Sequence, residues 1–333
     1  MRINDKETGL SKFFSNPIAV VFFATFCCAL WGSATPMIKL GYANMFDGGK
    51  PDVPSTILFA GIRFAIAGLL TIALYSIGRR KVLLPAKENF GRIAIVAAFQ
   101  TVIQYFFFYV GLANTTGAKG TIISGSSSFF AIFFSSLLFK TEKLTVKKVL
   151  ACIIGFANVI IINLNGLDLN INFTGDFFVL FSAMSLAVSS VLIKVFSKHE
   201  DAVVISGYQF MLGGAVMIVV GLLLGGGIDH WDTTGILILM YLSLLSAVAY
   251  ALWGLLLKYN PVSRVTIFSF MTPVFGVLLT NLMLPEKSDI RPLNLVLALA
   301  LVCIGVFLVN YNFKPQKAKL SASFSEEASV PEK

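Results

Sequence analysis

Long runs of apolar residues, separated by short polar stretches, follow one another along almost the whole chain. About 20 consecutive apolar residues allow a helix to cross the hydrocarbon core of a bilayer. We expect transmembrane helices over residues 17–40, 54–78, 90–112, 116–139, 146–163, 174–197, 203–225, 233–257, 263–284 and 292–311. The pattern therefore predicts an all-α integral membrane protein with about ten transmembrane helices.

Composition supports this prediction and argues against several kinds of site. Only 13% of the 333 residues are charged and 56% are hydrophobic, whereas about a quarter of a soluble domain is charged. Cys27, Cys28, Cys152 and Cys303 fall inside expected spans, which favours apolar packing over disulfides or metal binding. The spans contain no nucleophile–base pair or metal-ligating cluster, and the chain has no Gly-rich phosphate-binding motif. We expect no catalytic residue, no metal, no cofactor and no enzyme activity.

The basic residues are distributed unevenly between alternate loops. If the N-terminus is cytoplasmic, twenty of the 26 Lys and Arg residues lie on the cytoplasmic side, five lie outside, and Arg63 lies within a span. Cytoplasmic loops of membrane proteins carry such an excess. The distribution predicts that both termini are cytoplasmic, and it accounts for the net charge of +9 without a nucleic-acid partner.

The two halves of the chain are related in sequence. A shift of 144 residues brings the fourth expected span into register with the ninth and places Glu142 over Glu286. Nearer the start of each half, a slightly different shift places Arg63 over Gln209. We therefore expect two repeats of five helices each. Because five is odd, the second repeat is inverted in the membrane, as in secondary transporters whose halves open a central site to alternate sides.

The repeat divides the chain into segments. We expect a cytoplasmic N-terminal segment over residues 1–16, a first five-helix repeat over 17–164 and a second over 174–312. Residues 313–333 are polar and rich in Ser, Glu and Lys, which predicts a disordered cytoplasmic tail.

Three motifs follow one another at a recognisable spacing. The first span reads Ala-Leu-Trp-Gly-Ser from Ala29 and ends at Lys39, and the fourth ends in Glu-Lys-Leu-Thr from Glu142. The ninth contains Thr-Pro-Val-Phe from Thr272, followed by Leu-Pro-Glu from Leu284. With these motifs the chain resembles the drug/metabolite transporter superfamily, in the ten-helix branch that carries two EamA-type domains.

The resemblance implies a multi-pass protein of the plasma (inner) membrane that exports small organic metabolites, either amino-acid-like or drug-like. With the inverted repeat, it favours a secondary transporter that works by alternating access. A carrier of nucleotide-sugars or phosphorylated metabolites is one alternative. A non-transporting membrane scaffold or a lipid-modifying enzyme is another. The expected partners are a small-molecule substrate and the lipid bilayer, with the chain as a monomer or homodimer.

Polar side chains inside spans are costly, so each is a candidate for the site. Arg63 lies about nine residues into its span, near the middle of the membrane. It could bind a carboxylate or phosphate as a two-pronged donor, or serve as an anchor that bonds helix-end carbonyls. Lys39, near the outer end of its span, could extend to the interface or line the mouth of a cavity.

Small hydroxyl and amide side chains form further candidates. Ser124 and Ser128 are four residues apart and share a helix face, as do Gln100 and Gln104. Such residues can line a cavity or only join helices. The candidate cavity residues are Trp31, Thr35, Lys39, Arg63, Gln100, Gln104, Ser124, Ser128, Ser189, Tyr250, Trp253, Ser269 and Thr272.

The acidic residues fall in loops, tails or span ends. A proton-coupled carrier usually needs a titratable acid or His within the membrane, so the sequence disfavours a carboxylate relay. Glu142 and Glu286 end the fourth and ninth spans. We expect these two residues to cap nearby backbone or to pair with Lys143 and Lys287.

Overall fold

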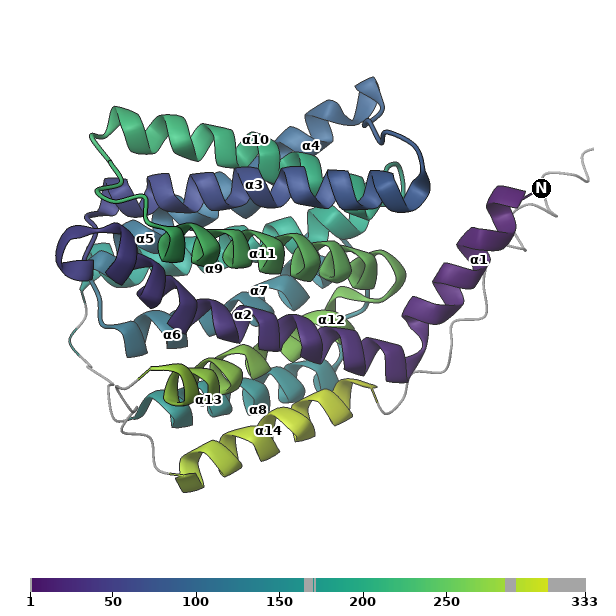
Figure 1. The fold of residues 1–333 in the computed structure, drawn as a ribbon. Helices are drawn as coiled ribbons and strands as arrows, with labels where there is room; N and C mark the ends of the chain where they lie inside the picture. Colours follow the sequence, from purple (N-terminus) through teal and green to yellow (C-terminus); the bar gives the residue numbers. More distant parts are fainter. Residues whose placement is uncertain (1, 165–169, 171, 285–291, 311–333) are drawn as a thin grey trace, which may run out of the picture.

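The structure is a computed structural model that describes residues 2–164, 170, 172–284 and 292–310. These residues form a helical bundle without strands (Figure 1). Within the described part of the chain, nine helices or helical runs are long and apolar enough to span a membrane, and Leu293–Val309 is a shorter apolar helix. The prediction of an all-α membrane protein with about ten spans is confirmed. The predicted tail over 313–333 lies outside the described residues.

The helices follow the expected order. The first half contains α1 (Arg2–Ser15), α2 (Pro17–Met45), α3 (Val53–Arg79), α4 (Phe90–Ala97), α5 (Gln104–Ala113), α6 (Gly117–Gly125), α7 (Ser127–Phe133) and α8 (Val146–Asn163). The second contains α9 (Phe173–Phe196), α10 (Ala202–Leu223), α11 (Thr233–Tyr259), α12 (Val262–Thr266), α13 (Thr272–Met283) and α14 (Pro292–Asn310). Short π or 3-10 turns complete these spans: η3 (Ala98–Ile103), η4 (Phe134–Leu138) and η6 (Ile267–Met271).

Polar loop residues start the long helices. Asn16, Asp52, Asn172, Asp201 and Asp232 each accept a hydrogen bond from a backbone N–H in the first turn that follows. Such caps satisfy donors that the helix itself leaves unpaired. At Asp52, hydrogen bonds from the side chain and backbone of the next helix hold the pKa of the carboxyl below its usual value.

The fourth span of each repeat is interrupted. The span expected over 116–139 is divided at Ser126, between α6 and α7, and ends in the π turn η4. In the second repeat, the turn η6 separates α12 from α13, and Pro273 lies in the first turn of α13. A Pro has no backbone N–H to donate to the preceding turn, so a break is favoured there. Both interruptions place polar groups near the middle of the bundle.

Helices α3 and α10 pack closely along most of their length (Figure 1). A Cβ placed on Gly61 would lie 2.7 Å from the backbone of Ile218, and one on Gly68 would lie 2.6 Å from Met211. Only glycine allows backbones to approach so closely. Because the partner residue number falls as the α3 number rises, the two helices are antiparallel, as expected for the second spans of two inverted repeats.

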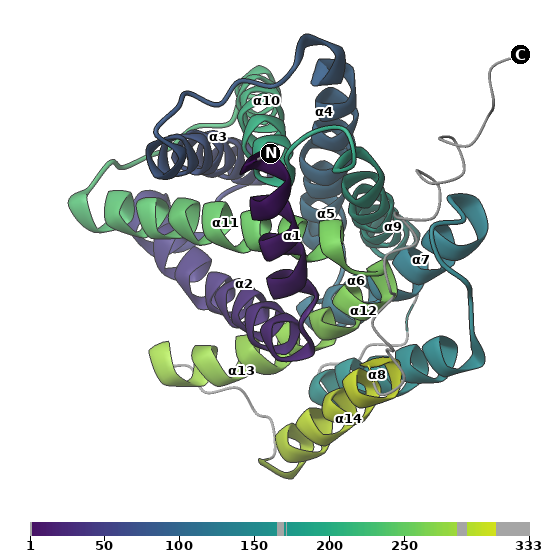
Figure 2. The ribbon, with the colours of Figure 1, turned by 90° about the vertical axis from the view of Figure 1, so that its right-hand side faces the viewer.

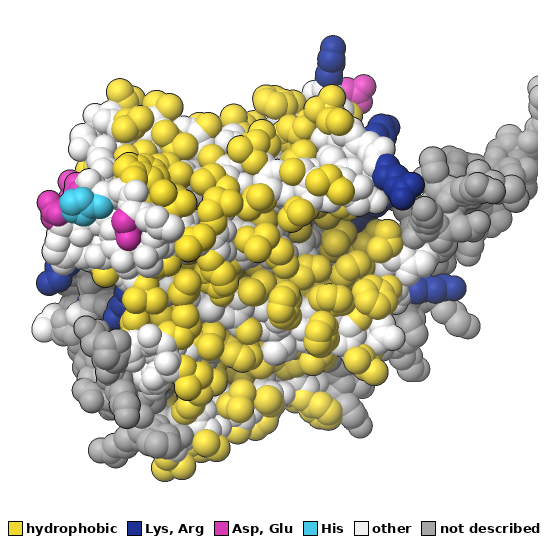
Figure 3. Space-filling view, in the orientation of Figure 1, with side chains coloured by type: hydrophobic (Ala, Val, Ile, Leu, Met, Phe, Trp, Pro, Cys, Tyr) yellow, Lys and Arg dark blue, Asp and Glu magenta, His cyan; other side chains and the backbone are white. Residues whose placement is uncertain are grey.

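The bundle has two chemically different ends. Lys and Arg side chains gather at one end, and Asp, Glu and His side chains are prominent at the other, with a broad apolar band between them (Figure 3). We call the first the basic end; it contains loops 80–89, 139–145, 197–201 and 259–261. Helix α1 also lies there, in front of α2 and α11 (Figure 2). The Asn260 side chain donates a hydrogen bond of 2.8 Å to the Phe14 carbonyl, which ties α1 to this end.

Candidate functional site

A cavity of about 770 Å³ lies between the two repeats. Its walls come from α2, α3, η3, α5, α6 and α7 of the first repeat and from α9, α11, α12, η6 and α13 of the second. Pockets that hold small organic ligands have volumes of about 300–1,000 Å³. The cavity therefore has the size and position expected for a small-molecule site between repeats.

Most of the candidate residues line this cavity, namely Trp31, Thr35, Lys39, Arg63, Gln100, Gln104, Ser124, Ser128, Tyr250, Trp253, Ser269 and Thr272. Ser189 does not. Its hydroxyl donates 2.8 Å to the Leu186 carbonyl of its own helix, and the side chain is fully buried. Ser182 and Ser190 of the same helix line the cavity instead. One residue turns a helix by about 100°, which is enough to move Ser189 off the cavity face.

The cavity is open at the end of the bundle away from the basic loops. Thr35, Lys39, Ala113 and Gly117 line it there, and all four are exposed. We call this the open end. Residues of the loops and first helical turns around the open end, including Pro51 and Thr56, contribute the outermost part of the wall.

Side chains of the two fourth spans form the floor of the cavity. The Ser128 hydroxyl donates to the Thr266 carbonyl at 3.0 Å and lies 2.6 Å from the Ser269 hydroxyl. Nearby, the Asn158 amide donates to the Phe270 carbonyl at 2.7 Å. These contacts join residues of the first repeat to the broken region of the second. The floor therefore depends on contacts between the repeats.

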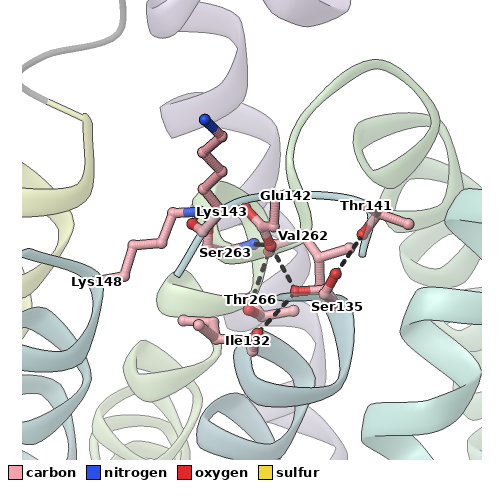
Figure 4. A network of polar contacts seen from close by, with 9 residues as sticks. All are labelled: Ile132, Ser135, Thr141, Glu142, Lys143, Lys148, Val262, Ser263 and Thr266. Carbon is pink, nitrogen blue, oxygen red and sulfur yellow. Dashed lines mark hydrogen bonds and ion pairs between the residues drawn. The ribbon is translucent and has the colours of Figure 1, made fainter. Parts of the chain in front are cut away.

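Behind the floor, at the basic end, Glu142 makes a dense set of polar contacts (Figure 4). Its carboxylate accepts hydrogen bonds from the Ser263 backbone N–H at 2.9 Å, the Ser263 hydroxyl at 2.5 Å and the Ser135 hydroxyl at 2.7 Å. Lys148 forms an ion pair with it at 2.7 Å. We call Ser135, Glu142, Lys148 and Ser263 the Glu142 clamp. The clamp joins the end of the fourth span of one repeat to the start of α12 in the other.

The clamp corrects the expected partners of Glu142. The cation is Lys148 rather than Lys143, whose carbonyl instead accepts a hydrogen bond from Lys148 at 2.6 Å. The capped backbone belongs to the second repeat rather than to a neighbouring turn. Glu286 and Lys287 lie outside the described residues.

Aromatic rings cover one side of the cavity. Trp31 packs edge-on against Tyr250 and Trp253, with ring centroids 5.1 and 4.9 Å apart. The hydroxyls of Tyr105 and Tyr250 are 2.9 Å apart, so the two rings are held together across the repeats. Edge-to-face packing of this kind fixes ring positions. The wall therefore offers rigid apolar surface with a few polar groups.

The π turn η3 displays the two glutamines. In the third span a regular helix gives way at Ala98–Ile103, and Gln100 and Gln104 both reach the cavity lining. Single π turns inside helices are frequent at functional sites because they shift the side chains that follow. Here the turn places two amides on the cavity face of an otherwise aromatic segment.

Several polar atoms of the lining have no hydrogen-bonding partner among the described residues. They include Trp31 Nε1, Gln100 Oε1, Gln104 Oε1 and Ser124 Oγ. Buried polar groups are almost always paired with protein, water or ligand. These atoms can form hydrogen bonds with molecules that enter the cavity.

Arg63 is buried in the cavity wall and is 4% exposed. Its Nε and Nη2 both donate to the Ser246 hydroxyl, at 3.1 and 2.9 Å. No acidic residue is among the described residues that line the cavity. The anchor considered from the sequence would bond helix-end carbonyls, whereas the observed acceptor is a serine hydroxyl on α11.

The sequence of the chain matches the model of the EamA-like transporter family over residues 18–164 and again over residues 173–311. The chain belongs to the EamA-like transporter family. The resemblance to the drug/metabolite transporter superfamily, drawn above from three motifs, is thereby confirmed.

Relatives of this EamA-like transporter match most of its length. An uncharacterized transporter of Synechocystis is 25% identical over 84% of this chain and 86% of the relative, and the uncharacterized transporter YvbV of Bacillus subtilis is 26% identical over 88% and 92%. A protein of Escherichia coli named as a probable amino-acid metabolite efflux pump is 25% identical over 84% and 91%. A crystal structure that is 18% identical superposes with a TM-score of 0.69 over 86% of this chain and 95% of the other, which shows a shared fold.

The sequence of this EamA-like transporter contained signals for lining residues that the candidate set omitted. Ser182, Leu186 and Ser190 are spaced four apart on α9 and all line the cavity. This spacing marks one face of a helix. Tyr105 and Tyr109 follow the same rule on α5. Helical periodicity within each span would therefore have found them.

Proposed function

We propose that this chain is a secondary transporter that exports small organic metabolites, amino-acid-like or drug-like, by alternating access. The observation that carries the proposal is the cavity between inverted repeats, open at one end and closed at the other by contacts between the repeats. In transporters built this way, the repeats exchange conformations around a central site. The Escherichia coli relative, named as a probable amino-acid metabolite efflux pump, supports both the substrate class and the direction.

We place the chain in the plasma membrane with the basic end in the cytoplasm. The excess of Lys and Arg at that end supports this orientation. The cavity then opens to the outside, and the Glu142 clamp and the floor close it toward the cytoplasm. In an exporter, this conformation releases substrate. To load substrate, the clamp and the Ser128–Ser269 contact must separate.

The proposal includes transport that does not require an imposed proton gradient. The described lining residues include no Asp, Glu or His that could carry a proton across the membrane. Relays of this kind use titratable side chains inside the membrane. Substrate exchange should therefore proceed with the same pH on both sides.

Counterflow in proteoliposomes at equal pH tests the proposal, with a panel of radiolabelled amino acids and drug-like compounds. Wild-type protein should exchange at least one of them. Gln104→Leu and Ser128→Leu should each reduce the exchange about tenfold, since one hydrogen bond contributes about 0.5–1.5 kcal/mol and the larger side chains also obstruct the cavity. Expression should be unchanged. Wild-type rates in both variants would place the transport site outside this cavity.

A further inference from the structure

The two repeats carry different side chains at one equivalent position, Arg63 in the first and Gln209 in the second. Each residue directly precedes a Phe, and Phe64 and Phe210 stack on one another with centroids 5.1 Å apart and planes 3° from parallel. The stacked pair lies where the antiparallel helices α3 and α10 meet. Arg63 and Gln209 are therefore related by the symmetry of the repeats, and each serves as a control for the other.

Both residues form a hydrogen bond with a hydroxyl in the third span of the opposite repeat, Arg63 as the donor and Gln209 as the acceptor. Arg63 donates to the Ser246 hydroxyl on α11. At the equivalent place, the Thr101 hydroxyl of η3 donates to Gln209 Oε1 at 2.7 Å. A neutral amide is thus sufficient to join a second span to a hydroxyl of the other repeat. The positive charge of Arg63 is not required for this structural contact.

Arg63 and Gln209 also differ in their surroundings. Arg63 lines the cavity, whereas Gln209 is fully buried and does not. Arg63 forms no ion pair with any described residue. A buried cation without a compensating anion is strongly unfavourable. An anionic group inside the cavity would compensate it, and the guanidinium group can donate two parallel hydrogen bonds to a carboxylate.

Building on the proposed transport function, we propose that Arg63 binds the carboxylate of the substrate, and that the substrate is an organic acid with a single carboxylate on an apolar or aromatic body. The rings of Trp31, Tyr250 and Trp253 provide rigid apolar surface for that body. Gln100 and Gln104 supply acceptors for an amine or hydroxyl next to the carboxylate.

The same wall disfavours the phosphorylated alternatives. Among the described lining residues the only cations are Arg63 and Lys39, and Lys39 lies at the open end. A nucleotide-sugar or sugar phosphate carries about two negative charges near pH 7, so it requires several cations close together. One interior Arg beside aromatic rings matches one carboxylate.

Matched pairs of carboxylic acids and their carboxamides test the proposal by calorimetric binding to protein in nanodiscs. The pairs are benzoate, phenylacetate, leucine, phenylalanine and tryptophan, each with its amide. At least one acid should bind wild-type protein, and about tenfold or more tighter than its amide, because hydrogen bonds to charged groups contribute more than neutral ones. Arg63→Gln, which copies Gln209, should reduce acid binding by about tenfold to a hundredfold and leave amide binding and the melting temperature unchanged.

The controls separate binding from anchoring. Arg63→Lys should retain part of the preference for acids, and Lys50→Gln, which removes an exposed cation outside the cavity, should retain all of it. A lower melting temperature of Arg63→Gln with equal loss of acid and amide binding, or binding of no acid at all, would overturn the proposal. Counterflow of a neutral or cationic compound by wild type and Arg63→Gln alike would overturn it while leaving the transport function intact. Counterflow of no compound would contradict the transport function itself.

Discussion

Helices α6 and α12 occupy equivalent positions in the two repeats but have opposite surroundings. Each begins the interrupted fourth span of its repeat, and a shift of 144 residues places Ala118 over Val262. All five residues of α12 are 4% exposed or less. In α6, Gly117 is exposed and Ala118 is half-buried. The same element of the repeat is therefore packed into the closed end in one copy and lines the open end in the other.

The difference follows from partners rather than from apolar character alone. The start of α12 receives Glu142 from the first repeat, and Arg264 donates to the carbonyl of Ser15, the last residue of α1, at 3.2 Å. In α6, Lys119 instead forms an ion pair of 2.9 Å with Asp176 of the adjacent α9. Polar contacts between repeats therefore occur at both ends, but only those at the closed end are made to α12 itself. In the alternating access that we propose, the contacts of α12 at the closed end must break when that end opens.

The largest effect on transport is expected when the floor is fixed in its closed form, so that the closed end cannot open. Ser128→Cys combined with Ser269→Cys places two thiols where hydroxyls now lie 2.6 Å apart, close to the length of about 2.05 Å of a disulfide. Oxidation should abolish counterflow, because α7 and η6 can no longer separate, and reduction should restore it. Counterflow before and after a reducing agent gives the measurement.

Cys303 is exposed and is replaced by Ser in this background, whereas the other native cysteines are buried. Ser128→Cys alone and Ser269→Cys alone, each in the same background, serve as controls, and their transport should not respond to oxidation. If the cross-linked protein, quantified by mass spectrometry, transported at the rate of the reduced form, then the floor would not need to open.

A smaller effect is expected when only the Glu142 clamp is removed. We compare cysteines at the equivalent positions Ala118 and Val262, each in a separate variant. A membrane-impermeant thiol reagent should label the Ala118→Cys protein in intact cells and leave the Val262→Cys protein unlabelled. In inverted vesicles, adding Glu142→Ala should raise the labelling rate at Val262→Cys about tenfold or more, because several hydrogen bonds to a carboxylate are lost.

Glu142→Gln keeps the size of the side chain and should give an intermediate rate. Labelling of Val262→Cys in intact cells, with Ala118→Cys protected, would reverse the orientation that we propose. An unchanged rate in the Glu142→Ala background would mean that apolar packing alone keeps α12 buried.

Much of the fold was predictable because a helix that crosses a membrane requires a continuous run of apolar residues, and each such run is visible in the sequence. The caps at Asp52 and Asp201 were not predicted, although Asp is a preferred residue at the start of a helix. The break at Ser126 was not predicted, although Gly125 and several serines weaken the helix there. The π turn η3 depends on packing against other helices, so local sequence does not determine it.

Residues of the candidate site were predictable where a charged or amide side chain lies inside an otherwise apolar span. A charge or amide inside an apolar span, such as Arg63 or Gln104, has few alternatives to a cavity. Contacts between repeats were harder to foresee. Glu142 and Ser263 are 121 residues apart, and the sequence pointed only to nearby backbone or to the neighbouring Lys143. Ser189 shows the remaining source of error, since choosing the cavity face requires the helix phase to within one residue.

The smallest expected effect comes from exchanging side-chain size between the two equivalent positions. Val262→Ala removes two methyl groups from a fully packed position, and at about 0.8 kcal/mol per buried carbon this should cost about 1.6 kcal/mol. Ala118→Val adds them at a half-buried position and should change stability by less than about 0.5 kcal/mol. Thermal unfolding of both variants in one detergent gives the comparison. If Ala118→Val were the more destabilising of the two, the added methyl groups would be meeting packed neighbours. The protein would then spend most of its time with α6 buried and α12 exposed, so that the open and closed ends would be exchanged in solution.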